Sequence, residues 1–152
     1  MSDTQELVYT DTEINQQALA NASAMPYLMV AFAQATGRTP EEAAEFVGNI
    51  FAPGWSRFTG MGALFIVRQM ALSIVCCGGE VQELTGDEQS AEAWVTGVPV
   101  QEEADFFGIS CDEADRFCNV FAPIATSLGF DFEWRRDDET LILSVRRGDA
   151  EV

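Results

Sequence analysis

Residues 61–77 decide the fold, and they read MGALFIVRQMALSIVCC. Apolar side chains cover most of a helical circumference in this segment, which is typical of a helix buried in a core. The run is shorter than the about 20 residues that a bilayer span needs, and Arg68 and Gln69 lie at its centre. We therefore predict a water-excluded helix from Thr59 to Cys77, ended by Gly78-Gly79, with the rest of the chain packed around it.

The chain before this segment is predicted to be helical. Residues 10–36 carry apolar side chains at helical spacing, and Pro26 among them predicts a kink or a break. Thr39, Pro40 and Glu42 then form a helix start, because Thr caps the helix, Pro fits its first position and Glu completes a capping box. This second helix should run to about Phe51.

After residue 79 the hydrophobic period changes towards two, which indicates strands. Residues 81–84 and 91–95 are predicted to pair as a β-hairpin, with its turn at Thr85-Gly86-Asp87-Glu88. A second hairpin is predicted between residues 130–136 and 140–147, because Phe130, Phe132 and Trp134 alternate on one strand and Leu141, Leu143 and Val145 on the other.

Two helices are predicted between the hairpins. Residues 101–107 form a short helix that Gly108 ends. A capping box from Ser110 to Glu113 begins a longer helix over residues 111–128, whose last turns Pro123 should bend. The fold class is therefore α+β: N-terminal helices, then hairpin, helix, helix, hairpin, with an antiparallel sheet packed against helices.

Length and composition indicate one domain. The chain has 152 residues, 47% of them hydrophobic and 22% charged, which is enough to bury a core without disulfides or a structural metal. We expect residues 1–152 to fold as one unit, with frayed ends at residues 1–10 and 148–152.

The strong negative charge argues against two classes of partner. A net charge of −17 repels phosphate backbones and anionic lipids, so we expect neither nucleic-acid binding nor membrane binding. The acidic surface is interpreted as a sign of a high-salt or high-GC source, and the rarer alternative is a decoy that imitates nucleic acid.

Two residue types are missing, and their absence restricts the chemistry. All eight basic residues are Arg, and the chain contains neither His nor Lys. Ser-His-Asp and Cys-His nucleophiles, imidazole metal ligands, Schiff-base lysines and the P-loop lysine are thereby excluded. A general acid or base must be a carboxylate, a tyrosine or a thiol.

The four cysteines, Cys76, Cys77, Cys111 and Cys118, have no Cys-x-x-Cys spacing. Residues 1–13 are polar and acidic, unlike a signal peptide. We expect free thiols, a cytoplasmic location, no cofactor and no metal site.

The second half of the chain resembles a family of small-molecule-binding domains. The resemblance rests on Gly60–Leu64 in the buried helix, on Trp94–Pro99 after the first hairpin, on Gly108–Ser110 before the long helix, and on the closing hairpin. These features are similar to those of 4-vinyl-reductase-type domains and L-2-amino-thiazoline-4-carboxylic acid hydrolase-like proteins. The resemblance implies an apolar ligand held between helices and sheet, commonly in a dimer.

Two positions depart from that family. Val98 stands before Pro99 where members often carry Cys, and residues 141–145 lack the Cys often found in the last hairpin. The resemblance therefore implies the fold and the ligand-binding habit, and it does not extend to hydrolase or metal–thiolate activity.

A ligand pocket is predicted around the turn that precedes the buried helix. Arg57 can hold a carboxylate while Trp55 and Phe58 enclose an apolar group. Arg68 must find a carboxylate or a ligand anion if it is buried in an apolar helix. The predicted ligand-binding residues are Trp55, Arg57, Phe58, Met61, Phe65, Arg68 and Trp94. The alternative is that the aromatic residues only cover the core and that each arginine pairs with an acid.

Cys111 is the best candidate nucleophile. It lies in the first turn of a predicted helix, where the helix dipole favours the thiolate, although neighbouring acids oppose that effect. Asp105 or Asp115 would be its catalytic partner.

Three functional hypotheses follow from these residues. The first is a sensory or accessory module that binds a small, largely apolar molecule, which can carry an anionic group. The second is a hydrolase or lyase that uses Cys111 with a carboxylate. The third is a structural subunit that forms a homodimer through an exposed aromatic face.

Overall fold

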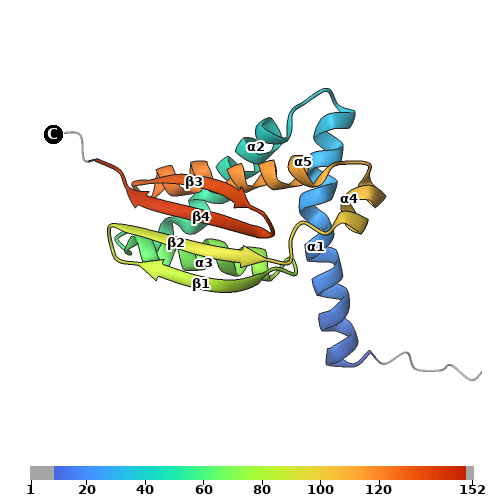
Figure 1. Cartoon of the computed structure of the whole chain (residues 1–152), viewed down its shortest axis with the longest axis horizontal. Coiled ribbons are helices and arrows are strands. Elements are labelled where there is room, and N and C mark those ends of the chain that lie inside the picture. The colour runs from blue at the N-terminus through green and yellow to red at the C-terminus, as the bar shows by residue number, and fades with distance from the viewer. Residues whose placement is uncertain (1–8, 150–152) are drawn as a thin grey trace, which may run out of the picture.

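Four antiparallel strands form one sheet in the order β1-β2-β4-β3, in a computed structural model that describes residues 9–149. The helices and strands are α1 (Asp11–Ala35), α2 (Pro40–Trp55), η1 (Ser56–Phe58), α3 (Ala63–Val75), β1 (Glu80–Gly86), β2 (Ser90–Thr96), α4 (Gln101–Phe107), α5 (Cys111–Arg116), η2 (Phe117–Val120), α6 (Phe121–Ser127), β3 (Phe130–Asp137) and β4 (Thr140–Arg147). This order confirms the predicted α+β class (Figure 1).

The sheet joins the two predicted hairpins side by side. In the second hairpin Phe132 is paired with Val145 and Trp134 with Leu143, so the predicted alternation is confirmed. β2 and β4 form the ladder between the hairpins, where Ala93 is paired with Leu143. Helices α3 and α6 cover one face of the sheet, and α1 stands across the end of the strands (Figure 1).

The buried face of α3 packs on the sheet. Ile66, Val67 and Met70 are fully buried and contact side chains of the two central strands. The opposite face is exposed at Arg68 and Leu72. The prediction of a helix excluded from water on all sides was therefore wrong, because the structure covers only one face of α3.

α3 also begins later than predicted. Gly62 is its N-cap residue and has no side chain that could cap the helix. The amides of Ala63 and Leu64 donate instead to the carbonyl oxygens of Glu88 and Asp87, at 3.0 and 2.9 Å. The helix thus starts where the turn of the first hairpin supplies acceptors, a long-range contact that local sequence does not reveal.

α1 continues through Pro26 without the predicted break. Proline lacks an amide hydrogen, so the carbonyl four residues earlier, that of Ala22, loses its helical partner. The thiol of Cys77 donates to this Ala22 oxygen at 3.5 Å. Burial raises the pKa of Cys77, which keeps the thiol protonated and able to donate.

The predicted helix over residues 111–128 is divided into α5, η2 and α6. The capping box is confirmed, because the amide of Glu113 donates to the Ser110 hydroxyl and the Ser110 amide donates to the Glu113 carboxylate. Pro123 cannot donate to residue 119, and a tighter 3-10 turn fills that region. Gly129 ends α6 with a φ of 84°.

Candidate ligand cavity

An apolar cavity of about 620 Å³ lies between α1, α2, α3 and the segment from α5 to α6. This size falls within the range of about 300–1,000 Å³ that is usual for small-molecule sites. Its walls are formed by Met25, Tyr27, Met29, Val47, Phe51, Trp55, Ile74, Cys77, Val98, Cys118, Phe121, Ile124 and Leu141, among others. It is therefore built from elements that lie far apart in the sequence.

The polar groups of the lining are few and already engaged. The Cys77 thiol donates to the backbone, as described above, and the Tyr27 hydroxyl accepts from the Val100 amide at 2.7 Å. Burial raises the pKa of Cys118 to about 12, so this thiol stays neutral. The cavity surface offers little to a charged ligand.

Asp115 is the one acidic or basic side chain among the described lining residues. Its side chain is buried, and Arg136 donates to both of its carboxylate oxygens, at 2.5 and 2.7 Å. Arg136 also donates to the carbonyl of Val98 at 2.8 Å. The charge of Asp115 is thus neutralised by a bidentate pair that ties α5 to β3.

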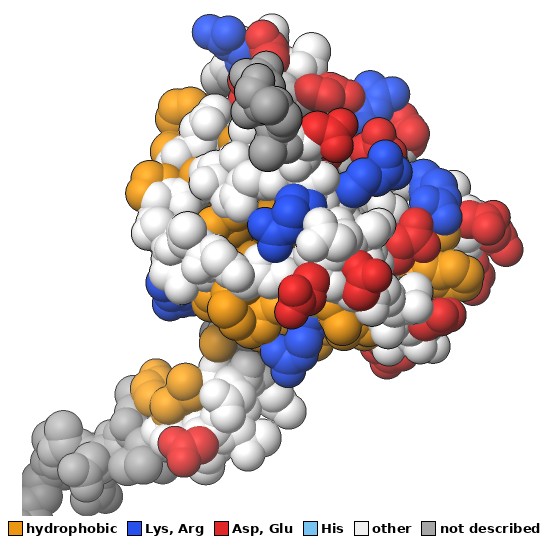
Figure 2. Space-filling model, turned by 90° about the vertical axis from the view of Figure 1, so that its left-hand side faces the viewer, with side chains coloured by type: hydrophobic (Ala, Val, Ile, Leu, Met, Phe, Trp, Pro, Cys, Tyr) orange, Lys and Arg blue, Asp and Glu red, His pale blue; other side chains and the backbone are white. Residues whose placement is uncertain are grey.

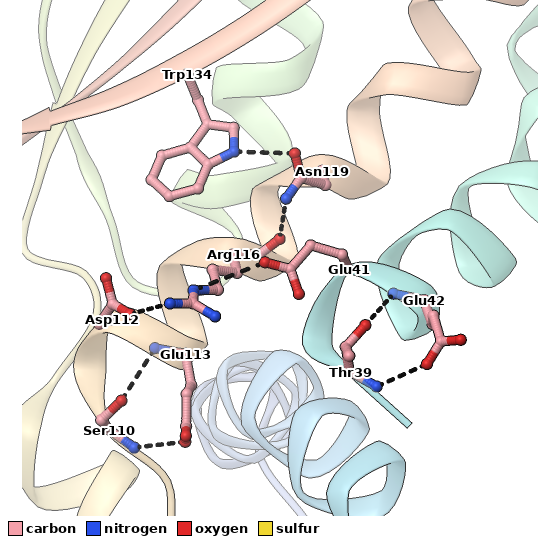
Figure 3. A network of polar contacts seen from close by, with 9 residues as sticks. All are labelled: Thr39, Glu41, Glu42, Ser110, Asp112, Glu113, Arg116, Asn119 and Trp134. Atoms are coloured by element: carbon pink, nitrogen blue, oxygen red, sulfur yellow. Dashed lines mark hydrogen bonds and ion pairs between the residues drawn. The ribbon is translucent and has the colours of Figure 1, made fainter. Parts of the chain in front are cut away.

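A polar network holds the wall from α5 to η2 against α2 (Figure 3). Arg116 donates to Asp112 at 2.8 Å and lies 3.7 Å from Glu41 at the start of α2. Asn119 donates to the Arg116 carbonyl and accepts from the indole nitrogen of Trp134, at 2.8 and 3.1 Å. This network fixes the position of the helical turn that carries Cys118 into the cavity.

The closest approach of α2 to this wall is at Gly48. A Cβ atom added there would overlap the carbonyl oxygen of Val120 and lie 2.8 Å from Cγ of Pro123. Glycine therefore lets the two walls meet beside the cavity.

Four of the predicted ligand-binding residues are aromatic, and three of them lie together. Trp55 lines the cavity, and its ring contacts Phe58 edge to face at 5.7 Å between centroids. Phe58 in turn contacts Phe65 at 5.3 Å. Phe58 and Phe65 pack against the core and do not line the cavity. Their position agrees with the alternative prediction that these aromatic residues only cover the core.

The remaining predicted ligand-binding residues lie elsewhere. Arg57 is exposed and stacks on the ring of Phe58, 4.7 Å from its centroid. Met61 and Arg68 are also exposed. Trp94 lies on the sheet face away from α3, where its indole nitrogen donates to Glu92 at 3.3 Å. Exposure of Arg68 removes the requirement for a buried counter-ion.

Cys111 and Asp105 are brought near each other by a shared glutamine. The Cys111 thiol donates to Oε1 of Gln101 at 3.4 Å, and Nε2 of Gln101 donates to Asp105 at 2.7 Å. Burial, together with the charge of Asp115, raises the pKa of Cys111. Of the two opposing effects expected at Cys111, the acidic neighbours together with burial therefore outweigh the dipole of α5, which has only six residues.

Several cavity residues were missed by the sequence analysis. Met25, Met29 and Val47 belong to apolar stripes of α1 and α2 that periodicity identifies but cannot orient. Val98 and Pro99, in the segment between β2 and α4, also line the cavity. The sequence did contain one indication of the cavity. Both helices carry more apolar side chains than a single buried face needs, so some of these side chains were free to line a pocket.

The part of the chain covered by the structure, residues 9–149, contains no group of three or more Cys, Asp or Glu side chains placed to bind a metal ion. No helix among these residues has both the length and the apolar character of a membrane span.

Comparison with protein families, with curated proteins and with solved structures found no match to this chain.

Proposed function

We propose that the chain is a binding domain for a small, neutral, apolar molecule that occupies the cavity. The observation that carries this proposal is the cavity of about 620 Å³ with its almost wholly apolar lining. Apolar cavities are poorly hydrated, and an apolar molecule that enters one gains contacts without displacing strongly bound water. A sensory or accessory role agrees with this proposal.

Neutrality of the ligand is supported by the state of Arg136. An anionic ligand needs a free cation or unpaired donors in the pocket. Arg136 donates hydrogen bonds to two lining residues. Its guanidinium is already held by the carboxylate of Asp115 and the carbonyl oxygen of Val98. An added carboxylate would compete with a pair that is already formed, so an uncharged molecule is favoured over the anion first expected.

The alternative of a cysteine-dependent hydrolase or lyase has weaker support. The raised pKa of Cys111 leaves little thiolate at neutral pH, and its nearest polar partner is the amide of Gln101. An amide cannot accept the thiol proton as a general base does. The likeness to 4-vinyl-reductase-type domains stays a prediction.

The test is binding of a neutral environment-sensitive dye, N-phenyl-1-naphthylamine, followed by fluorescence. Ser73 lies on α3 at the cavity, so Ser73→Trp should fill part of the space. We expect this variant to weaken dye binding at least about tenfold, because the ring removes volume and contacts worth about 1.4 kcal/mol or more. Native mass spectrometry of the purified wild-type chain should also show a retained small molecule.

The matched control is Leu72→Trp, one residue earlier on α3. Leu72 is exposed and does not line the cavity. This variant should bind the dye like the wild type. Equal binding by all three proteins, or no saturable binding by the wild type, would contradict the proposal.

A further inference from the structure

α1 carries two apolar faces, and its own chain covers only one of them. Tyr27, Val30 and Ala33 are buried against the body of the protein. On the opposite side of the helix Ile14, Met25, Leu28 and Phe32 are exposed, with exposed fractions from 46% at Leu28 to 63% at Phe32. A helix with a second apolar stripe of this kind is typical of an element that packs between two bodies.

The N-terminal part of α1 stands clear of the body, as Figures 1 and 2 show. Residues 11–21 are all exposed. A segment of this length is marginal as an isolated helix in water, so tertiary contacts are needed to hold it. The described part of its own chain does not provide them.

The apolar stripe continues from α1 onto α2. A hollow between the two helices is lined by Met29, Phe32 and Phe46, and the cavity mouth adds Ile50 and Phe51. The charged side chains of Arg38, Glu42 and Glu45 also line this hollow, on its α2 side. Eight large apolar side chains of α1 and α2 are between 46% and 65% exposed: Ile14, Leu19, Met25, Leu28, Phe32, Phe46, Ile50 and Phe51. Exposure of so many large apolar side chains on two neighbouring helices is typical of an interaction surface. A standard interface buries about 800 Å² on each partner.

This surface is also unusual in its charge. The run from residue 14 to residue 37 contains no charged side chain, and neither does the run from 46 to 56, although the chain carries 25 acids and eight arginines. Figure 2 shows acidic and basic side chains spread over the face of the molecule that it draws. A partner with a net charge of −17 meets no acidic side chain in these two segments, so charge repulsion is weak there.

We propose that the stripe formed by Ile14, Met25, Leu28 and Phe32 on α1, with Phe46 on α2, is the interface with a second copy of this chain. A second copy presents the same apolar stripe and the same charge-free segments, so the two surfaces match each other in character. A basic protein partner is disfavoured, because the stripe residues carry no charge and, of the acids beside Phe32 and Phe46, Glu42 already pairs with Arg38.

The two α1 helices pack antiparallel about a two-fold axis near residue 23. In that register Ile14 faces Phe32 of the partner subunit, and Ala18 faces the partner's Leu28, so that apolar side chains meet apolar side chains. Ile14 and Phe32 lie about 27 Å apart along the helix. Antiparallel packing thus lays the projecting part of each α1 beside the body-bound part of the other α1, whereas parallel packing would support the two projecting parts only by each other.

Oligomeric state tests this inference. Light scattering after size exclusion should give the full chain twice its monomer mass of 16.6 kDa at micromolar concentration. Ile14→Glu should raise the dimer dissociation constant at least about 100-fold, because each dimer carries the unpaired charge twice. The control Gln16→Glu adds the same charge on the other side of the same helical turn, and it should remain a dimer.

Cysteine cross-linking tests the register. Ile14→Cys combined with Phe32→Cys should form a covalent dimer on mild oxidation, well above the level given by the four native cysteines of the wild type. Ile14→Cys alone should not, since the two copies of residue 14 lie at opposite ends of the interface. Efficient cross-linking of Ile14→Cys alone would overturn the antiparallel arrangement.

Two further results would overturn the inference. One is a monomeric wild-type chain, and the other is an equal loss of dimer in Ile14→Glu and Gln16→Glu. Of the stripe residues, Met25 and Phe46 also line the cavity, whereas Ile14, Leu28 and Phe32 do not. A monomeric wild type that still binds the dye would therefore reject the interface and leave the binding function intact, and the reverse result would do the opposite.

Discussion

Asp115 and Arg136 form the most enclosed ion pair in the described part of the chain. The side chain of Asp115 is 8% exposed and that of Arg136 is 25% exposed. Removing one member of such a pair leaves a charge with little access to water, which costs far more than the loss of a surface pair. The pair also joins α5, β3 and the Val98 carbonyl at one point of the cavity wall.

Asp115→Ala should lower the free energy of unfolding by about 2–4 kcal/mol, because Arg136 is then left without its carboxylate partner. Urea unfolding followed by circular dichroism measures this change. Arg38→Gln is the control, since Arg38 pairs with Glu42 in an exposed position. That variant should change the free energy of unfolding by less than about 0.5 kcal/mol. Similar values for both variants would show that water reaches the Asp115 pair freely.

Cys77 illustrates a contact that no sequence pattern reports. Pro26 predicts a defect in α1, and only the three-dimensional structure shows that a thiol 55 residues away donates to the carbonyl that Pro26 leaves unpaired. Arg68 shows the opposite kind of error, in which a sequence pattern predicts a contact that does not form. Its place in an apolar segment predicted burial, but its side chain is exposed to water.

At the scale of elements, Gly48 controls how closely α2 approaches the segment from η2 to α6. Gly48→Ala should destabilise the fold by about 1–3 kcal/mol, because the new methyl group overlaps the Val120 carbonyl. Gly54→Ala, in the same helix, meets no atom within 4 Å and should be neutral or stabilising by up to about 1 kcal/mol. Thermal unfolding of the two variants measures the contrast. A stable Gly48→Ala variant would mean that the two walls can separate at little cost.

Elements specified by local signals were predicted well. The capping boxes at Thr39 and Ser110 and the helix stop at Gly108 are present as expected. Alternation along residues 130–136 and 140–147 placed the closing hairpin correctly. Each of these signals acts over a few residues, so its outcome depends little on the rest of the chain.

The cavity could not be predicted in the same way. Sequence periodicity identified apolar stripes on the helices but not which stripe meets which neighbour. The aromatic residues and arginines of the sequence predicted a pocket around Arg57, Phe58 and Arg68 near the start of α3, whereas the cavity lies against Ile74 and Cys77 near its end. Of the seven residues predicted to bind a ligand, Trp55 alone is among the described cavity residues.

At the scale of the whole molecule, the net charge of −17 opposes the association of two copies. If the proposed dimer forms through charge-free surfaces, salt should strengthen it, because screening weakens the repulsion between the bodies. Raising the salt concentration from about 20 mM to about 200 mM shortens the screening length from about 20 Å to about 7 Å, so the dimer dissociation constant should fall severalfold. Analytical ultracentrifugation at both concentrations measures this fall.

The sign of that salt effect is diagnostic. An interface made by ion pairs would weaken as salt rises. A weaker dimer at high salt would therefore contradict the charge-free interface, even if the chain is dimeric.

The order β1-β2-β4-β3 has a consequence for how the chain folds. Each hairpin joins neighbours in the sequence and can close quickly, but the central ladder joins Ala91 to Val145 across four intervening helical segments, α4, α5, η2 and α6. Closing so long a loop has a high entropic cost before any contact repays it. We therefore expect the rate-limiting step of folding to be the pairing of the two preformed hairpins along β2 and β4. The helices between them should pack onto the sheet in the same step.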